Sequence, residues 1–358
     1  MSLKAIFSSV VLIAIGVVSS VAVQAADLPW PFKPLPEVAE APKDNPPTKE
    51  KLALGKQLFF DPRLSITGTH SCNSCHNLSA GGEDGRAQPV GVYGRTGKRS
   101  TQTLWNAALH TVYNWDGSAK TLEEQAQKHI LDSRIMGMPD AETLVSRINT
   151  IPGYRQQFEQ VFGKAGVSIN TTAMALSSYE RTLLTPNGAF DRYLRGDDKA
   201  ISAEAKRGAK EFIDVGCAAC HFWVNLAGPI PGLALQQGEG FYELFPNYSG
   251  TDYETRYNLA DDLGRVYFSQ EPTDTRMWRM PSLRNIAITA PYFHNGSVKT
   301  LDEAVSVMAK TQLRKELTER QVSDIVAFLS SLTGEFPSQT LPRLPETPKR
   351  TAVAGHDH

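Results

Sequence analysis

The sequence predicts a mainly α-helical protein with two domains. Residues that cap helix N-termini recur at Thr121, Thr300 and Thr318, and each is followed by apolar residues at helical spacing. Alternation of apolar and polar residues with a period of two, the pattern of a strand, is nearly absent. A short cysteine pattern occurs twice, and 358 residues exceed the length of one ordinary domain.

The N-terminus is predicted to direct export. Residues 1–25 contain one lysine, an apolar run from Ala5 to about Val23, and small residues that end at Ala25, which together are typical of a secretory signal peptide. An uncleaved membrane anchor is the alternative, because the run nearly has the length that a bilayer requires. Either interpretation places the folded part outside the cytoplasm, and we predict the periplasm. Residues 26–46 form a Pro-rich arm, a linker or surface segment.

The charge balance argues against two classes of partner. The chain has 37 basic and 38 acidic residues and a formal net charge of −1. Such a balance gives no general attraction for nucleic acid or for an anionic membrane surface. We therefore expect no nucleic-acid partner.

All four cysteines lie in one pattern, Cys-x-x-Cys-His, at residues 72–76 and again at 217–221. On a helical turn, cysteines three residues apart face one side, so that both thiols can form thioethers with the vinyl groups of one haem. The histidine that follows then lies under the iron as its fifth ligand. The sequence therefore predicts two covalent c-type haems, attached through Cys72, Cys75, Cys217 and Cys220, with His76 and His221 as proximal ligands.

Other uses of paired cysteines fit the sequence less well. Disulfides and thioredoxin-like redox chemistry are the alternatives for an exported chain, and the histidine directly after each pair argues against both. A zinc site would need four converging ligands, whereas the two motifs are far apart in the chain. The predicted fold class is therefore mainly α, with two cytochrome c-like domains that each hold one covalently bound c-type haem.

Helices are predicted along most of the chain. "GKQLFFD" from Gly55 and "GAKEFID" from Gly208 each lead into a haem motif, which indicates two copies of one unit. Further helices are predicted at residues 141–151, 154–162 and 171–184 and after the three capping threonines. Residues 228–278 are predicted to be a long functional loop. Turn residues indicate a boundary between an N-terminal domain, 47–190, and a C-terminal domain, 191–345, followed by a disordered tail, 346–358.

The sixth ligand of each iron decides between catalysis and electron transport, because catalysis needs an open coordination position. The spacing of residues in the sequence does not show which side chain is the sixth ligand. Each candidate also has a structural alternative in a helix, a loop or the core. The candidates are His70, His110, His129, His294, Met136, Met138, Met277, Met280 and Met308.

Several segments resemble the bacterial dihaem cytochrome c peroxidases and the related MauG-type enzymes. They include "LGKQLFFDPRLS", "NWDGSAKTLEEQA", "ERTLLTPNGAFDRYLRGDDKAIS", "PSLRNIAITAPYFHNGSVKTLDEAV" and "IVAFLSSLTGE", and they run in family order over nearly all of the chain after the arm. The resemblance implies that the first haem, with His76, is peroxidatic and of low potential. It implies that the second haem, with His221 and Met308 as axial ligands, stores electrons at high potential, which a thioether ligand favours. The alternative for Met308 is packing on a helix face.

The resemblance also assigns residues between the haems. Trp115 matches a tryptophan that relays electrons, with a structural role in the core as the alternative. The backbone carbonyls of Thr289 and Pro291 match a calcium site, to which hard oxygen ligands are suited. Ser100 stands where the family has an asparagine, and this weakens the calcium prediction.

Two departures from the family pattern affect the first haem. Val92 stands where the peroxidases have a removable distal histidine, so we expect an iron that is five-coordinate or water-bound; Tyr93 is a less favoured substitute ligand. Ile135 stands at the position of the distal glutamate, and isoleucine cannot transfer a proton. Asp132 or Arg134 could supply charge from the same loop.

The resemblance implies an oxidoreductase that reduces hydrogen peroxide with electrons from a small donor protein, a cytochrome c or a cupredoxin. One alternative is MauG-like oxidation of a partner protein's side chain by long-range hole transfer, with Trp278 or Trp223 as surface relays. The other is a dihaem electron-transfer cytochrome without catalysis. Met308 favours the first function, whereas Val92 and Ile135 favour the second. A homodimer, as the family's peroxidases form, stays open.

Overall fold

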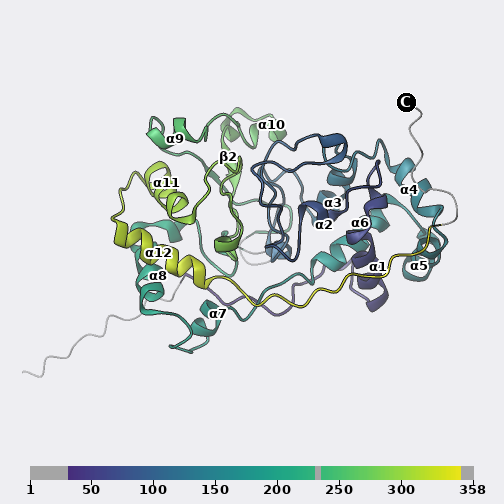
Figure 1. Cartoon of the computed structure of the whole chain (residues 1–358), viewed down its shortest axis with the longest axis horizontal. Coiled ribbons are helices and arrows are strands. Elements are labelled where there is room, and N and C mark those ends of the chain that lie inside the picture. The colour runs from purple at the N-terminus through teal and green to yellow at the C-terminus, as the bar shows by residue number, and fades with distance from the viewer. Residues whose placement is uncertain (1–30, 230–234, 348–358) are drawn as a thin grey trace, which may run out of the picture. The chain divides into compact units, whose positions relative to one another are not determined.

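Helices dominate the computed structural model, which describes residues 31–229 and 235–347 (Figure 1). The predicted signal peptide, the first residues of the arm and the tail beyond residue 347 lie outside these ranges. The first half of the chain forms α1 (Lys49–Phe60), α2 (Cys72–Cys75), α3 (Leu122–Leu131), α4 (Ala141–Asn149), α5 (Pro152–Phe162) and α6 (Ile169–Glu180). The second half forms α7 (Ala189–Leu194), α8 (Ala203–Val215), α9 (Asp252–Arg256), α10 (Val266–Ser269), α11 (Leu301–Leu313) and α12 (Glu319–Ser331).

The predicted helix starts are confirmed at all three capping threonines. The side chains of Thr121, Thr300 and Thr318 accept hydrogen bonds from backbone N–H groups in the first turns of α3, α11 and α12. Such a bond satisfies one of the free donors at a helix N-terminus. The helices predicted at residues 141–151, 154–162 and 171–184 correspond to α4, α5 and α6.

The long loop predicted at residues 228–278 is more ordered than expected. Strand β1 (Tyr242–Leu244) pairs antiparallel with β2 (Met277–Arg279), and Glu243 lies opposite Trp278. Helices α9 and α10 lie between these strands. Strands of three residues are too short to show an alternating pattern, so the sequence could not indicate them.

The repeat predicted from Gly55 and Gly208 appears as two equivalent helix pairs. Helix α1 packs on α6, and α8 packs on α12 (Figure 1). A side chain on Gly55 would overlap the backbone carbonyl of Ala175, and one on Gly208 would overlap that of Asp324. Each glycine therefore allows the two helices of its pair to approach at backbone distance.

A second repeat links residues 104–131 with residues 283–310. Asn106 and Asn285 both have a left-handed backbone conformation, and a 3₁₀ turn follows each one. Isolated bridges then join Tyr113 to Ala119 and Tyr292 to Val298, after which α3 and α11 begin. The two segments align without a gap, so the chain contains two copies of a larger unit than the sequence indicated.

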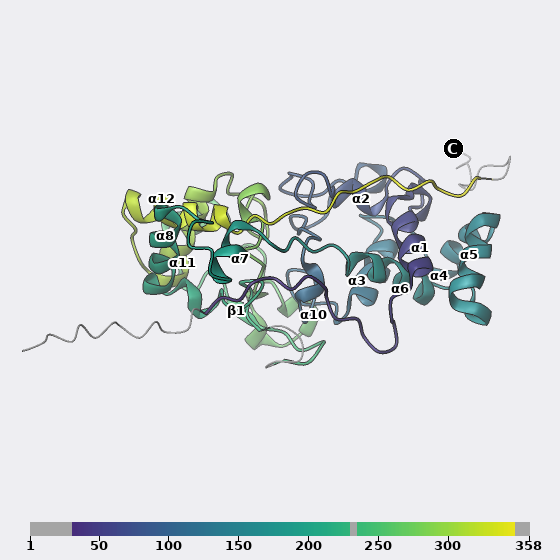
Figure 2. The same ribbon diagram turned by 90° about the horizontal axis from the view of Figure 1, so that it is seen from below.

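Two extended segments run between the halves of the described chain. In the arm, Phe32 packs among Phe190, Phe212 and Phe328. The arm then reaches α6, where Nδ2 of Asn45 donates a hydrogen bond to the backbone carbonyl of Met174. The segment after α12 runs back along α1, as Figures 1 and 2 show in yellow. There Gln57 donates to the carbonyl oxygen of Arg343, 2.9 Å away. The arm is thus partly core, which corrects its prediction as a linker or surface segment.

Two separate apolar cores lie on either side of the predicted domain boundary. The first includes Leu58 of α1 and Leu176 of α6, and the second includes Trp278 and Val307 of α11. The described residues nevertheless belong to one compact unit that begins at Pro31. The division at residue 190 stays a prediction. Within residues 31–229 and 235–347, every helix is too short or too polar to cross a bilayer.

Candidate haem sites

Both cysteine motifs line one cavity of about 990 Å³. This volume is at the upper end of the roughly 300–1,000 Å³ range of ligand sites in proteins. Its lining includes Cys72, Cys75 and His76 of the first motif and Cys217, Cys220 and His221 of the second. The structure therefore brings all six predicted attachment and ligand residues to a single cavity.

Each motif forms the helical turn that haem attachment requires. The first is helix α2, and the second begins with a 3₁₀ turn at Cys217–Ala219. The N–H of His76 donates to the carbonyl of Cys72 at 2.9 Å, and the N–H of His221 donates to that of Cys217 at 3.0 Å. The two cysteines and the histidine of each motif thus occupy one turn.

The cysteines are free and are kept neutral by their surroundings. All four lack a disulfide bond, which contradicts the disulfide alternative. Burial raises the pKa of the Cys75 and Cys220 thiols to about 11 and that of Cys217 to about 12. Such thiols are poor redox nucleophiles. No cluster of three metal-binding side chains occurs in the described ranges, so a zinc site has no support there.

The two histidines predicted as proximal ligands each place Nδ1 beside a backbone carbonyl oxygen. Nδ1 of His221 lies 2.9 Å from the carbonyl oxygen of Leu226, and Nδ1 of His76 lies 3.4 Å from that of Gly82. Because a carbonyl oxygen only accepts, Nδ1 carries the hydrogen, and the lone pair of Nε2 is free for a metal. Burial lowers the pKa of both imidazoles to about 4, so both rings are neutral. These residues fit covalently attached haem.

Trp115 and Met308, to which the resemblance assigned roles at the haems, also line the cavity, and those roles stay predictions. The Trp115 Nε1–H donates to the carbonyl oxygen of Ser100 at 2.8 Å. Its ring meets His294 edge to face, with centroids 6.5 Å apart, and His294 stacks on Trp278 at 4.1 Å. Trp278 is 5% exposed, so the interpretation of Trp278 as a surface relay is wrong.

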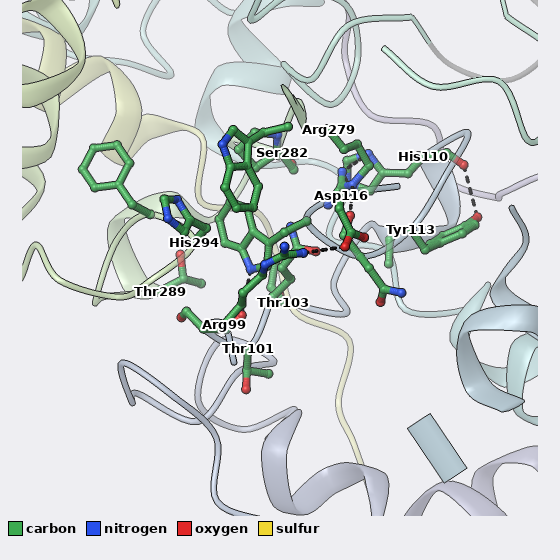
Figure 3. Close-up of a pocket in the computed structure, with 18 of the residues that line it drawn as sticks. Arg99, Thr101, Thr103, His110, Tyr113, Asp116, Arg279, Ser282, Thr289 and His294 are labelled. Atoms are coloured by element: carbon green, nitrogen blue, oxygen red, sulfur yellow. Dashed lines mark hydrogen bonds and ion pairs between the residues drawn. The ribbon is translucent and has the colours of Figure 1, made fainter. Parts of the chain in front are cut away.

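Charged groups that the sequence did not single out hold this aromatic cluster. The guanidinium of Arg99 lies 4.7 Å from the ring centre of Trp278 and forms ion pairs with Asp116 and Asp262, at 2.6 and 2.7 Å. Figure 3 shows the pair of Arg99 and Asp116 beside His294. The side chains come from separate loops, so their spacing along the chain does not indicate that they meet.

The two residues that depart from the family pattern lie near each other. The backbone N–H of Val92 donates to the carbonyl of Ile135 at 3.0 Å. Ile135 lines the cavity, whereas Val92 is buried away from it, and Tyr93 is 54% exposed. Neither Val92 nor Tyr93 lines the cavity, and Tyr93 as a substitute ligand stays a prediction. Thr289 and Pro291 line it, and calcium binding by their carbonyl oxygens stays a prediction.

Glu180, the last residue of α6, is a buried carboxyl group that sequence reasoning missed. It lines the cavity, and its Oε2 has no hydrogen-bond partner among the described residues. Burial raises the pKa of Glu180 from 4.5 to about 7. The protonated carboxyl is therefore the form that the fold prefers.

The raised pKa of Glu180 predicts a specific pH dependence of stability. The folded state holds the proton of Glu180 more tightly than the unfolded state does. The contribution of this group to the free energy of unfolding is therefore fully present below about pH 4.5 and is lost as the pH rises through 7. We expect Glu180→Gln to exceed the wild type in free energy of unfolding at pH 8, by about 1–3 kcal/mol. Denaturant unfolding of both proteins at pH 4.5 and pH 8 measures the difference. Equal differences at the two pH values, or a similar gain from the exposed control Glu335→Gln, would contradict this assignment.

The fold and the paired motifs define a haem-binding protein of the cytochrome c type. A family model described as di-haem cytochrome c peroxidase matches residues 49–199. The chain is 40% identical over 323 residues to the cytochrome c551 peroxidase of Pseudomonas aeruginosa, a match that covers 89% of each chain. It is 36% identical to the methylamine utilization protein MauG of Methylorubrum extorquens, covering 87% of this chain and 86% of that one. The chain therefore belongs to the di-haem cytochrome c peroxidase and MauG family.

The comparison with solved structures agrees with this assignment. A MauG-like protein associated with microbial copper homeostasis has a TM-score of 0.74 and 29% sequence identity, and the match covers 87% of this chain and 95% of that one. The resemblance found in the sequence is confirmed, as is the predicted class of enzyme, a haem oxidoreductase. Haem is the cofactor of this family.

Proposed function

We propose that this protein is a periplasmic dihaem c-type oxidoreductase that reduces hydrogen peroxide with electrons from a small donor protein, a cytochrome c or a cupredoxin. The observation that carries the proposal is the single cavity lined by both Cys-x-x-Cys-His motifs, in a chain 40% identical to a cytochrome c551 peroxidase. Bound haems supply iron that reacts with peroxide and stores electrons one at a time.

In this proposal, each of the two haems has its own attachment cysteines and its own axial ligands. Cys72, Cys75 and His76 hold the first haem. The second is held by Cys217, Cys220 and His221, with Met308 as its sixth ligand. Helix α11 supports the last assignment, because it presents Met308 to the cavity that His221 also lines.

Trp115 is proposed to connect the two haem sites. Its indole is fixed in place by the hydrogen bond to Ser100 and continues through His294 to Trp278. The ion pairs of Arg99 keep a positive charge against the face of Trp278. A rigid aromatic cluster of this kind suits electron movement without rearrangement of the chain.

The proton chemistry differs from that of the family's peroxidases. Ile135 offers no proton. Burial raises the pKa of Asp132, but the hydrogen bond from Arg134 outweighs this effect, so that the pKa of Asp132 is lowered overall. Asp132 therefore stays ionised at neutral pH and is a weak proton donor. This feature favours the second candidate function, MauG-like oxidation of a partner protein's side chain, and the chain is 36% identical to a MauG protein.

Steady-state assays of the purified holoprotein separate the candidates. We expect added peroxide to oxidise a reduced small cytochrome c or cupredoxin catalytically. If the donor stays reduced while peroxide causes oxidation of a side chain in a partner protein, the MauG-like function replaces our proposal. If peroxide produces neither result, the protein is an electron-transfer cytochrome and the proposal is wrong.

A further inference from the structure

His129 on α3 lines the cavity on the side of the first motif. Its charge is among the causes that lower the pKa of His76, after burial, so the two imidazoles are near each other. Ile135, at the position of the family's distal glutamate, lines the same cavity. His129 thus lies close to the proposed proximal ligand of the first haem.

The second repeat gives His129 a counterpart in the other half of the chain. Helices α3 and α11 begin after Thr121 and Thr300, whose side chains cap them in the same way. His129 is the eighth residue of α3, and Met308 is the eighth residue of α11. Because equal positions in equivalent helices point in the same direction, His129 occupies the place at the first haem that Met308 occupies at the second.

The imidazole of His129 has the same arrangement as those of His76 and His221. Its Nδ1 lies 3.0 Å from the backbone carbonyl oxygen of Gln125, which can only accept a hydrogen bond. The tautomer with the hydrogen on Nδ1 satisfies that carbonyl and leaves the lone pair of Nε2 for a metal. The side-chain Nε2 of Gln125 also lies 3.1 Å from this Nδ1 and favours the other tautomer, but an amide turned by 180° would accept instead.

The other histidines around the cavity are less suited to the first iron. His110 is held by Arg279 and by Asn225, at 2.9 and 3.3 Å. His294 stacks on Trp278. His70 is partly exposed beside Thr69, whose hydroxyl lies 2.9 Å from its Nδ1. Of these histidines, only His129 shares a helix position with Met308.

We propose that Nε2 of His129 is the sixth ligand of the first haem iron in the resting ferric protein, opposite His76. The assignment rests on the proposed attachment of that haem to His76. It revises the expectation, drawn from Val92, that this iron is five-coordinate or water-bound. The ligand that peroxide has to displace then lies on a helix, and not on the loop that carries Val92. A resting ligand present in 90% of molecules lowers the apparent peroxide affinity about tenfold.

The spin state of ferric haem tests this proposal independently of turnover. Electron paramagnetic resonance of the resting holoprotein is expected to show two low-spin haems. His129→Ala should convert one of the two haems to high spin, and added imidazole should return it to low spin. His129→Met should keep that haem low-spin and raise its reduction potential, since a thioether is the higher-potential ligand. His70→Ala is the matched control and should leave both haems low-spin.

Two outcomes would overturn the proposal. One is a high-spin haem already present in the resting wild type, and the other is a His129→Ala protein in which both haems stay low-spin. Failure of the proposed function looks different: the wild type would show the predicted spectra and their change in His129→Ala, but would not turn over peroxide.

Discussion

Replacing Cys72 and Cys75 together with alanine is expected to leave one covalent haem per chain and to abolish peroxide reduction. The two thiols lie on one helical turn beside His76 and line the cavity, so the variant loses both thioether bonds of the first haem. Mass spectrometry of the intact chain counts covalent haem, and a donor-oxidation assay measures turnover. Peroxide turnover is expected to fall to background.

The matched variant Cys217→Ala/Cys220→Ala distinguishes the two sites. It should also carry one covalent haem, but the remaining haem should still change its absorption spectrum when peroxide is added, because His76 and its surroundings are intact. The assignment of roles would be contradicted if the spectral response to peroxide were lost with the second motif and kept without the first.

Phe32→Ala is expected to destabilise the protein by about 3–5 kcal/mol, as truncation of a buried phenylalanine does. Phe32 is 2% exposed, and its ring centre lies 5.6–6.2 Å from those of Phe190, Phe212 and Phe328. Phe212 in turn lies 6.2 Å from His221, so the cavity left by the variant would adjoin the second haem site. Denaturant unfolding followed by fluorescence or circular dichroism measures the loss.

Val38→Ala is the control for the arm, because Val38 belongs to the same segment and is 78% exposed. Its effect should stay within about 0.5 kcal/mol. If the two variants lost similar amounts of stability, the arm would be a surface segment in solution, as its composition alone suggested.

The features that the sequence predicted are those with local causes. A capping threonine and the apolar spacing after it determine where a helix starts, and so α3, α11 and α12 begin where expected. The chemistry of Cys-x-x-Cys-His is contained in five consecutive residues, and the structure brings both copies to one cavity. Gly55 and Gly208 could be matched because the residues around them are similar in type.

Most of the features that could not be predicted from the sequence depend on contacts between distant segments. The Pro-rich composition of the arm gives no sign that Phe32 is buried among residues from α7, α8 and α12. Arg99 meets Asp262 across more than a hundred residues. The equivalence of His129 and Met308 has a different origin: "YNWDGSAKTLEE" from Tyr113 and "YFHNGSVKTLDE" from Tyr292 match in the sequence itself, and sequence reasoning missed this repeat.

We propose above that one chain holds two haems around one cavity. Pyridine haemochrome absorbance of the purified protein, divided by its molar concentration, measures this directly. We expect two c-type haems per chain, and a value of one or none would contradict the proposed function.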